Sequence, residues 1–407
     1  MMKPAWGLTV CIALAASFKA QAQTMKVYQG QVITAVPDTH VNEVTFQNNG
    51  TSFTVSGNTF QVAETDQILI DRTEVIPASV QVAYTNEGAW VTVSADIAPY
   101  LDIQTTGNHI RIIAAPTLNK EVSYTLTGNA NEGSFYMDGE YKAKLTLSNL
   151  QLTNPAGAAI DIANGKRIDV ILPNGTESTL ADGTGGTHKA CLFINGHAEF
   201  KGAGTLNLTG NTKHAYASDE YTCFKSSFGT LNILSAVSDG LHIEQYLEMS
   251  GGNITITGTQ GDCIDVGITK DPLDEYNGQT FIHGGNLNLS VAANDTKGIK
   301  TDQMLTLTGG HVKANVSGNG SKGFSVGSDL TVQQAEGADL HIDMDVSGST
   351  FMPGDPVMES KCRGIKVKGN FTFNGGSIQM NVTGADAKGI SLDGTYNYIS
   401  GTTNVLP

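Results

Sequence analysis

Apolar and polar residues alternate in short runs along most of the chain after residue 25, and Gly and Asn separate the runs. A period of two predicts β-strands, because successive side chains of a strand point to opposite faces. Residues 52–62 show this pattern on both sides of Gly57-Asn58, which predicts a hairpin. We expect residues 23–116 to form a small β-rich N-terminal region, with further strands at 80–84, 90–95 and 110–114 and turns at 86–88 and 107–108.

From about residue 145 one phrase recurs: a small residue, an apolar residue, any residue and a second apolar residue. Many copies are followed by a Gly turn and further alternating strands, and the basic unit is about 25 residues long. Such short strands cannot bury an apolar face alone, but units stacked in register can. An antiparallel sandwich also alternates, yet it has no reason to repeat one phrase. The small positions are Cys191, Cys223, Gly240, Cys263, Gly298, Gly323, Gly364 and Gly389.

The repeat predicts an all-β fold in which residues 117–407 form a right-handed parallel β-helix, a solenoid of stacked turns. Two long intervals in the repeat predict insertions that project from it, at 269–279 and 349–361. Cys191, Cys223 and Cys263 occupy small positions, so we interpret them as buried packing residues. Cys191 and Cys223 could form a disulfide if their copies of the phrase lie on adjacent turns. Because Cys-x-x-Cys is absent, we expect no zinc site.

The first 22 residues predict a secretory signal peptide. Lys3 precedes an apolar run at 5–17, and Ala20-Gln21-Ala22 supplies small residues before a cleavage site near Gln23. This run is too short to span about 30 Å of hydrocarbon, and no later stretch comes closer to doing so. We expect an exported protein with no transmembrane segment, located in the periplasm, on the cell surface or outside the cell.

Composition narrows the classes of protein. The 407 residues include 47 Gly, and only 15% are charged, which excludes a coiled coil or helical bundle. With 24 basic and 39 acidic side chains the formal net charge is −15, so a nucleic-acid partner is excluded and a cationic partner is favoured.

Stacked turns bring the residues before the small positions into one column, which changes sign along the axis: Asp239, Asp262, Lys297, Lys322, Arg363 and Lys388. In its acidic section carboxylates lie within about 5 to 10 Å of one another, so they must protonate, be solvated apart or hold a cation. Flexible carboxylates suit calcium best. A solvated acidic face, with Asp as a turn former, is the alternative. The candidate calcium ligands are Asp239, Glu244, Asp262, Asp265, Asp295 and Asp302.

The basic section offers candidate glycan-binding residues. Lys297, Lys300, Lys322 and Arg363 could pair with an acidic polymer, or they could pair locally with carboxylates of the same protein. Tyr246 and Tyr276 are candidates to stack on sugar faces, although rim packing would also explain them.

Several phrases carry a family resemblance over residues 122–394. They include Tyr124-Thr-Leu-Thr-Gly128, Asn195-Gly-His-Ala-Glu-Phe200, Ser238-Asp-Gly-Leu-His-Ile243 and Thr296-Lys-Gly-Ile-Lys300. In this order they resemble a secreted carbohydrate-binding β-helix family of bacteria, whose fold is similar to family-nine pectate lyases. The resemblance implies calcium held by Asp side chains and binding of plant-type or acidic glycans. Asp239, Asp262 and Asp265 match its acidic positions, whereas Cys263 and the basic residues before four later glycines depart from it.

We therefore expect a non-catalytic, calcium-dependent polysaccharide-binding protein. The first alternative is a polysaccharide lyase that acts on uronate-containing glycans by calcium-assisted β-elimination, with Lys300 or Lys225 as the base. Such a base needs a lowered pKa. The second alternative is a structural or adhesive surface protein.

Overall fold

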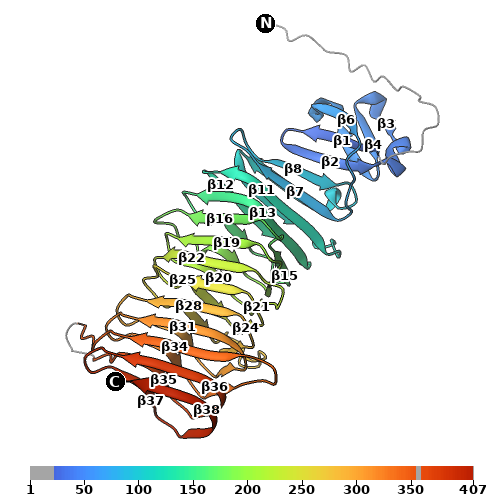
Figure 1. Cartoon of the computed structure of the whole chain (residues 1–407). Coiled ribbons are helices and arrows are strands. Elements are labelled where there is room, and N and C mark those ends of the chain that lie inside the picture. Colours follow the sequence, from blue (N-terminus) through green and yellow to red (C-terminus); the bar gives the residue numbers. More distant parts are fainter. Residues whose placement is uncertain (1–22, 354–358, 407) are drawn as a thin grey trace.

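The computed structural model of the protein describes residues 23–353 and 359–406. It is all-β, and the strands stack along one long axis with strand β1 near one end of the stack and strand β38 at the other (Figure 1). Within the described part the helices are short 3-10 turns, and none is long and apolar enough to cross a membrane. These turns are η1 (Asp38–Glu43), η2 (Asn48–Gly50), η3 (Val62–Glu64) and η4 (Ala98–Tyr100). The predicted signal peptide at 1–22 lies outside the described residues.

The N-terminal strands form a small core of their own around Val27, Phe53 and Phe60. The predicted hairpin at 52–62 is confirmed, since β4 and β5 pair antiparallel across Gly57. Here β1 pairs with β2 and β6, and β2 pairs with β8. The strands are β1 (Thr24–Gln29), β2 (Val32–Pro37), β3 (Thr45–Gln47), β4 (Ser52–Val55), β5 (Asn58–Gln61), β6 (Gln67–Asp71), β7 (Ser79–Tyr84) and β8 (Trp90–Ser94).

Strand β7 links this region to the rest of the molecule, because it pairs antiparallel with β8 and parallel with β11 (Val122–Ala130). A 12-stranded sheet begins beside it with the antiparallel pair β9 and β10 and is parallel from β10 onward. We call this sheet the first stack. Its strands are β9 (Leu101–Thr106), β10 (Asn108–Ala114), β12 (Gly133–Asp138), β14 (Ile160–Ile162), β17 (Ala190–Ile194), β20 (His214–Ser218), β23 (Leu241–Glu244), β26 (Ile264–Gly267), β29 (Lys297–Thr301), β32 (Lys322–Val326), β35 (Arg363–Val367) and β37 (Lys388–Leu392).

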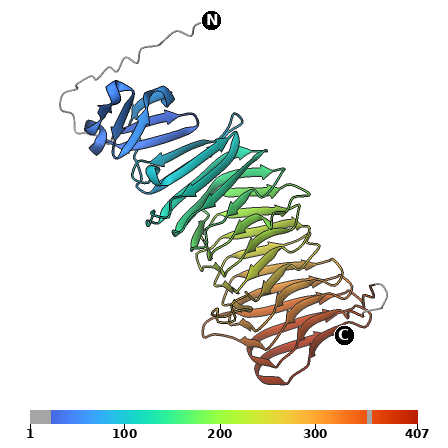
Figure 2. The same cartoon turned by 180° about the vertical axis from the view of Figure 1, so that it is seen from behind.

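Two further parallel stacks complete each turn of the chain, and long strands at the two ends run through both of them. Figure 2 shows the same layers from behind. The second stack contains β15 (Ile168–Ile171), β18 (Ala198–Lys201), β21 (Thr222–Phe224), β24 (Tyr246–Met249), β27 (Gln279–Ile282), β30 (Leu305–Leu307) and β33 (Leu330–Gln333). The third contains β16 (Glu177–Asp182), β19 (Thr205–Gly210), β22 (Thr230–Ala236), β25 (Asn253–Ile256), β28 (Asn286–Val291), β31 (Gly310–Val316) and β34 (Leu340–Val346). The long strands are β11, β13 (Ala143–Asn154), β36 (Phe371–Val382) and β38 (Tyr396–Leu406).

One continuous core lies between the stacks, from Val80 to Met380. The alternation produces it: in β34 the side chains of Leu340, Ile342, Met344 and Val346 are buried, while those between them face outward. Neighbouring parallel strands lie about 4.8 Å apart, so equivalent residues of successive turns become direct neighbours. Side chains far apart in the sequence therefore form columns on the outer face.

The small-residue column is present but begins differently from the prediction. Gly240, Cys263 and Gly298 are in register in the first stack, and Gly323, Gly364 and Gly389 continue the column. The position assigned to Cys223 was wrong: Cys223 lies in β21 of the second stack, between Glu199 and Glu248. Ala215 of β20 holds the position between Cys191 and Gly240 instead. This copy of the phrase ends in Ala217-Ser218, so the polar Ser218 stands where most other copies have their second apolar residue.

The described cysteines, Cys191, Cys223, Cys263 and Cys362, are all buried and unpaired. The disulfide considered between Cys191 and Cys223 is therefore absent, which agrees with their positions in different stacks. Their role is to fill space within the fold.

Candidate functional site

Three predicted acidic residues, Asp239, Asp262 and Asp265, lie close together on the first stack. Asp239 and Asp262 precede β23 and β26, and the backbone N–H of Asp262 donates to Asp239 Oδ1 at 2.8 Å. Asp265 lies in β26, in register with His242 of β23. The stacked turns thus bring Asp239 to Asp262 and Asp265, from which the sequence separates it by more than twenty residues, as the repeat predicts.

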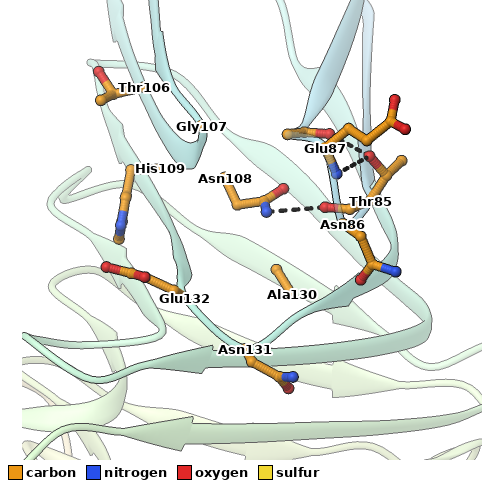
Figure 3. A pocket seen from close by; sticks show the side chains of 11 residues that line it. Thr85, Asn86, Glu87, Thr106, Gly107, Asn108, His109, Ala130, Asn131 and Glu132 are labelled. Atoms are coloured by element: carbon orange, nitrogen blue, oxygen red, sulfur yellow. Dashed lines mark hydrogen bonds between the residues drawn. The ribbon is translucent and has the colours of Figure 1, made fainter.

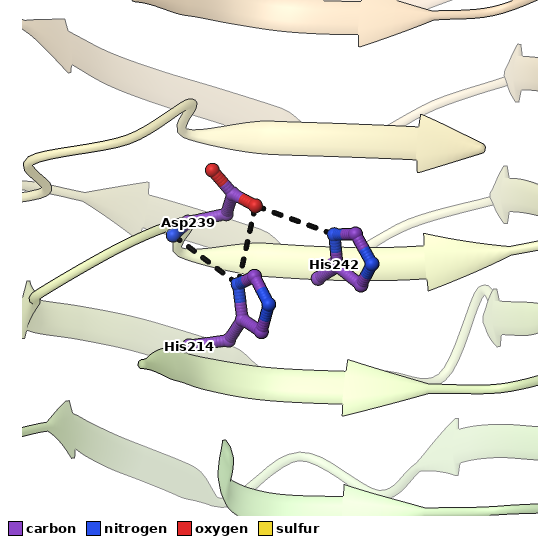
Figure 4. Close-up of side chains that lie close together, drawn as sticks. All are labelled: His214, Asp239 and His242. Atoms are coloured by element: carbon purple, nitrogen blue, oxygen red, sulfur yellow. Dashed lines mark hydrogen bonds and ion pairs between the residues drawn. The ribbon is translucent and has the colours of Figure 1, made fainter. Parts of the chain in front are cut away.

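Histidines sit among these carboxylates. His242 Nδ1 lies 3.3 Å from Asp239 Oδ2 and 3.3 Å from Asp265 Oδ2. His214 Nδ1 lies 3.1 Å from the same Asp239 oxygen, and its ring stacks on that of His242 with centroids 4.2 Å apart. Figure 4 shows both rings turned toward Asp239. His214 was not among the predicted site residues, because its turn carries Ser218 where the repeated phrase usually ends in an apolar residue.

Burial and charge act against each other in this cluster. Burial lowers the pKa of His242, but the carboxylates of Asp239 and Asp265 outweigh it and raise that pKa to about 9. Burial lowers the pKa of His214, and the contact with Asp239 only partly offsets this. Burial raises the pKa of Asp239, yet the two imidazoles hold it well below its usual range. Burial raises the pKa of Asp262 to about 6. His242 and Asp239 therefore form a carboxylate–imidazolium pair, whereas the Asp262 carboxyl is costly to ionise.

The predicted basic strip is engaged with groups of the same molecule. Lys300 Nζ donates to Asp265 Oδ1 at 2.8 Å, and Lys297 Nζ donates to the Asp295 carbonyl at 2.6 Å. Lys322 Nζ contacts Asp295 Oδ1 at 3.2 Å. Arg363 is 7% exposed. Its Nη1 donates to the carbonyls of Cys362 and Asp386. Of the two explanations for these residues, local pairing is the one that the geometry shows.

The remaining predicted ligands lie further along the first stack. Glu244 ends β23 in register with Gly267, and Asp302 follows β29, two turns after β23. Among the described residues neither carboxylate has an ion-pair partner. Asp295 accepts from Ser360 Oγ at 2.6 Å as well as from Lys322, so it belongs to a separate, later cluster.

The two candidate bases are both ion-paired. Burial lowers the pKa of Lys300, but its hydrogen bond to Asp265 outweighs this and raises that pKa above its ordinary value. A lysine general base needs the opposite shift. Lys225 Nζ lies 3.3 Å from Glu199 Oε1 on the second stack. The Asp265 carboxylate thus pairs with the Lys300 ammonium group, and the Glu199 carboxylate pairs with that of Lys225.

An aromatic ladder follows the turns between the first and second stacks. The rings of His197 and Tyr221 stack with centroids 4.3 Å apart, and those of Tyr221 and Tyr246 stack at 4.8 Å. Tyr276 meets Tyr246 edge-on at 5.6 Å and Phe281 edge-on at 5.2 Å. The Tyr246 ring therefore lies against two aromatic neighbours, whereas Tyr276 is 47% exposed. Tyr276 is the member of the ladder that is open to a ligand.

The insertion that contains Tyr276 forms one wall of an open cleft with a volume of about 550 Å³. Internal bonds order this insertion: Asn277 Oδ1 accepts from the backbone N–H of Thr269 at 2.8 Å, and Asn277 Nδ2 donates to the Asp271 carbonyl at 2.9 Å. Tyr276 has φ +55°, a left-handed conformation that is unfavourable for a bulky residue. We call this space the insertion cleft; its lining is Ile268, Thr269, Lys270, Pro272, Asp274, Tyr276, Asn277, Gln279 and Gln303.

A second open cleft of about 520 Å³ lies near the N-terminal end of the stacks. Figure 3 shows its polar lining, which includes Glu87, His109, Asn131 and Glu132 from three neighbouring turns. Asn108 Nδ2 donates across it to the Thr85 carbonyl at 2.9 Å. No aromatic side chain other than the His109 imidazole lines this cleft, and none of the predicted site residues does. It is therefore the weaker candidate for a ligand that needs a ring face.

Comparison with known proteins gives the family. The profile of carbohydrate-binding domain-containing proteins matches residues 106–405, which is well over half of the chain. The chain belongs to this carbohydrate-binding domain family. A carbohydrate-binding domain-containing protein of Acetivibrio thermocellus is 25% identical over 149 residues, which are 34% of this chain and 43% of the relative. The chain thus matches less than half the length of that curated relative.

A solved structure is also similar to this member of the carbohydrate-binding domain family. It is described as a polysaccharide lyase-like protein from C. thermocellum in a gadolinium derivative, and it is 17% identical. The match covers 81% of this chain and 100% of that chain with a TM-score of 0.46. We call the group formed by His214, Asp239, His242, Asp262 and Asp265 the ionised cluster. The family match spans both this cluster and the insertion cleft.

Proposed function

We propose that this protein is an exported, non-catalytic polysaccharide-binding protein that holds its glycan in the insertion cleft. The family match over residues 106–405 is the observation that carries the proposal. The repeated phrase and the register of the three stacks support a right-handed parallel β-helix as its scaffold.

The chemistry of the insertion cleft suits a sugar ring. Tyr276 offers a half-exposed aromatic ring to the C–H face of a pyranose. Gln279, Gln303 and Asp274 place amide and carboxylate groups around it, and these can donate to or accept from hydroxyl groups. Exposed apolar side chains, Ile268 at 53% and Leu273 at 89%, extend the surface for a chain longer than one sugar.

Calcium dependence stays a prediction. Calcium prefers a set of oxygen ligands. The predicted ligands do not form such a set as they lie: Asp239 and Asp265 face the His242 imidazole, Asp265 is bound by Lys300, and Asp295 is bound by Lys322. The pairing of Asp239, Asp265 and Asp295 with basic groups leaves few of the predicted carboxylates available to calcium, and the proposed binding mode does not depend on this ion.

Affinity electrophoresis and calorimetry test the proposal. The wild-type protein is titrated with polygalacturonate and with neutral β-glucan oligosaccharides, with and without EDTA. Tyr276→Ala should weaken binding at least about tenfold, which corresponds to about 1.4 kcal/mol. Tyr100→Ala is the matched control, because Tyr100 is 39% exposed but distant from the cleft, and it should bind like wild type. Equal loss in both variants would refute the assignment of the cleft.

A lyase assay tests the alternative. Incubation with polygalacturonate while the absorbance of unsaturated products is followed should give a flat trace. The ion pairs of Lys300 and Lys225 with Asp265 and Glu199 favour this result, because a protonated, paired lysine cannot accept a proton. A steady rise that Lys300→Ala abolishes would establish β-elimination and overturn the non-catalytic proposal. Absence of binding to every glycan would leave the structural or adhesive role.

A further inference from the structure

The histidine and aspartate side chains of the ionised cluster converge on one point from successive turns. One ligand atom each from His214, Asp239 and His242 can be chosen so that all three lie within 4.8 Å of one another. Two of the separations, both to Asp239 Oδ2, are 3.1 and 3.3 Å. Asp265 Oδ2 lies 3.3 Å from His242 Nδ1 and adds a fourth candidate atom. Figure 4 shows the three residues from the first stack.

The three nitrogen–oxygen separations match the edges of a transition-metal coordination shell, and the two stacked imidazoles, whose planes differ by 12°, would have to turn for both to face one ion. Imidazole nitrogen and carboxylate oxygen bind zinc at about 2.0 to 2.2 Å. Two ligands at that distance lie about 3.0 Å apart at a right angle and about 3.4 Å apart at a tetrahedral angle. The observed contacts fall within this interval, and they are longer than the usual 2.9 Å of an N–H···O hydrogen bond.

The hydrogen bonding of the two imidazoles is incomplete, which is an independent sign of a missing ligand. His242 Nδ1 is buried and has no hydrogen-bond partner, although two carboxylates face it. At His214 Nδ1 the Asp239 backbone N–H, 3.3 Å away, and the Asp239 carboxylate compete for one atom. A nitrogen cannot both accept from the N–H and donate to the carboxylate, so neither tautomer satisfies this residue.

We propose that His214, Asp239 and His242 bind a divalent transition-metal ion of the zinc type, with Asp265 as a fourth ligand. Imidazole is a preferred ligand of zinc, copper and nickel, whereas calcium takes oxygen ligands. The histidines therefore select against the ion that the acidic column suggests. The expectation that zinc is absent considered only cysteine motifs, and histidines from different turns carry no such motif in the sequence.

The bound ion would connect three consecutive strands of the first stack, β20, β23 and β26. One carboxylate oxygen is already oriented for it, since Asp239 Oδ1 accepts the Asp262 N–H at 2.8 Å and leaves Oδ2 directed at the imidazoles. Such an outer contact typically fixes a ligand before metal arrives. The inference does not depend on the proposed glycan binding, because the ion would fasten the scaffold and not the sugar.

Metal titration of the untagged full chain tests the proposal. The protein is first treated with chelator and then titrated with Co²⁺, followed by visible absorbance, and with Zn²⁺, followed by calorimetry and elemental analysis. We expect one Zn²⁺ per chain, a Co²⁺ spectrum that Zn²⁺ abolishes, and a higher melting temperature with Zn²⁺ than with chelator. His242→Asn should lower the Zn²⁺ affinity at least about tenfold. His283→Asn is the matched control, because His283 is exposed in the second stack, and it should titrate like wild type.

Three results would overturn the proposal: no stoichiometric uptake by wild type, unchanged uptake by His242→Asn, or displacement of Co²⁺ by calcium at comparable concentration. Should His242→Asn fail to fold, Asp265→Asn provides the second test, since the substitution keeps the size of a side chain that is only 13% exposed. A Co²⁺ spectrum in Asp265→Asn identical to that of wild type would exclude Asp265 as a ligand, and a shifted spectrum would confirm it.

Discussion

The small-residue column predicts a sharp steric limit at Gly323, where a side chain has no room. A Cβ added at Gly323 would lie 2.5 Å from the Gly364 carbonyl oxygen and 2.7 Å from Met344 Sδ. Met344 can move, but the Gly364 oxygen belongs to the backbone of the next turn. Gly323→Ala must therefore push two strands of the first stack apart.

We expect this overpacking to cost about 2 kcal/mol, within the range typical of an extra methyl group in a tight core. A loss of that size lowers the melting temperature by about 3 °C in a cooperative unit of about 300 residues, the length of the continuous core. Gly165→Ala is the control, because a Cβ there would meet only Asn195 Nδ2, at 3.6 Å. Circular dichroism during heating compares the two variants. If Gly323→Ala melts at the temperature of Gly165→Ala, the turns are not stacked as described.

Two further predictions follow from buried polar groups. Burial raises the pKa of Cys223 and Cys263 to about 12, so their thiolates are scarce at pH 8 to 9. A thiol reagent should therefore react with the described cysteines only after the protein unfolds. Prompt reaction of the native protein would contradict their burial. The Asp182 side chain is fully buried and accepts from His188 Nε2 at 2.7 Å and from the backbone N–H of Thr212 at 3.3 Å. Asp182→Ala should therefore lower the free energy of unfolding by about 3 kcal/mol in urea titrations. A loss below about 0.5 kcal/mol would contradict this role.

The sequence was informative wherever one turn repeats the next. The column from Gly240 to Gly389 and the gathering of Asp239, Asp262 and Asp265 follow from register alone, because parallel strands place equivalent residues side by side. Cys223 was misplaced since Thr222-Cys223-Phe224 has the same small-then-apolar order, although its phase is reversed and Cys223 lies between two outward-facing Glu residues.

Other features of the site depend on side-chain direction, which a repeat does not encode. Lys322 and Arg363 stand in the predicted column, yet their long side chains bend back to carbonyl and carboxylate oxygens of their own turn and the next. His214 joins Asp239 only because its ring leans beneath that of His242. The left-handed backbone at Tyr276, which frees one ring of the ladder, arises within an insertion that has no counterpart in other turns.

Hydrogen–deuterium exchange with a bound oligosaccharide is the most direct test of where this protein holds its glycan. The experiment compares free and saturated protein, using the tightest-binding oligosaccharide from the titrations. We predict slower exchange in peptides that cover 268–279 and the backbone around Gln303, and no change at 85–88 or 130–132. Protection at the N-terminal cleft with none in the insertion would contradict the account.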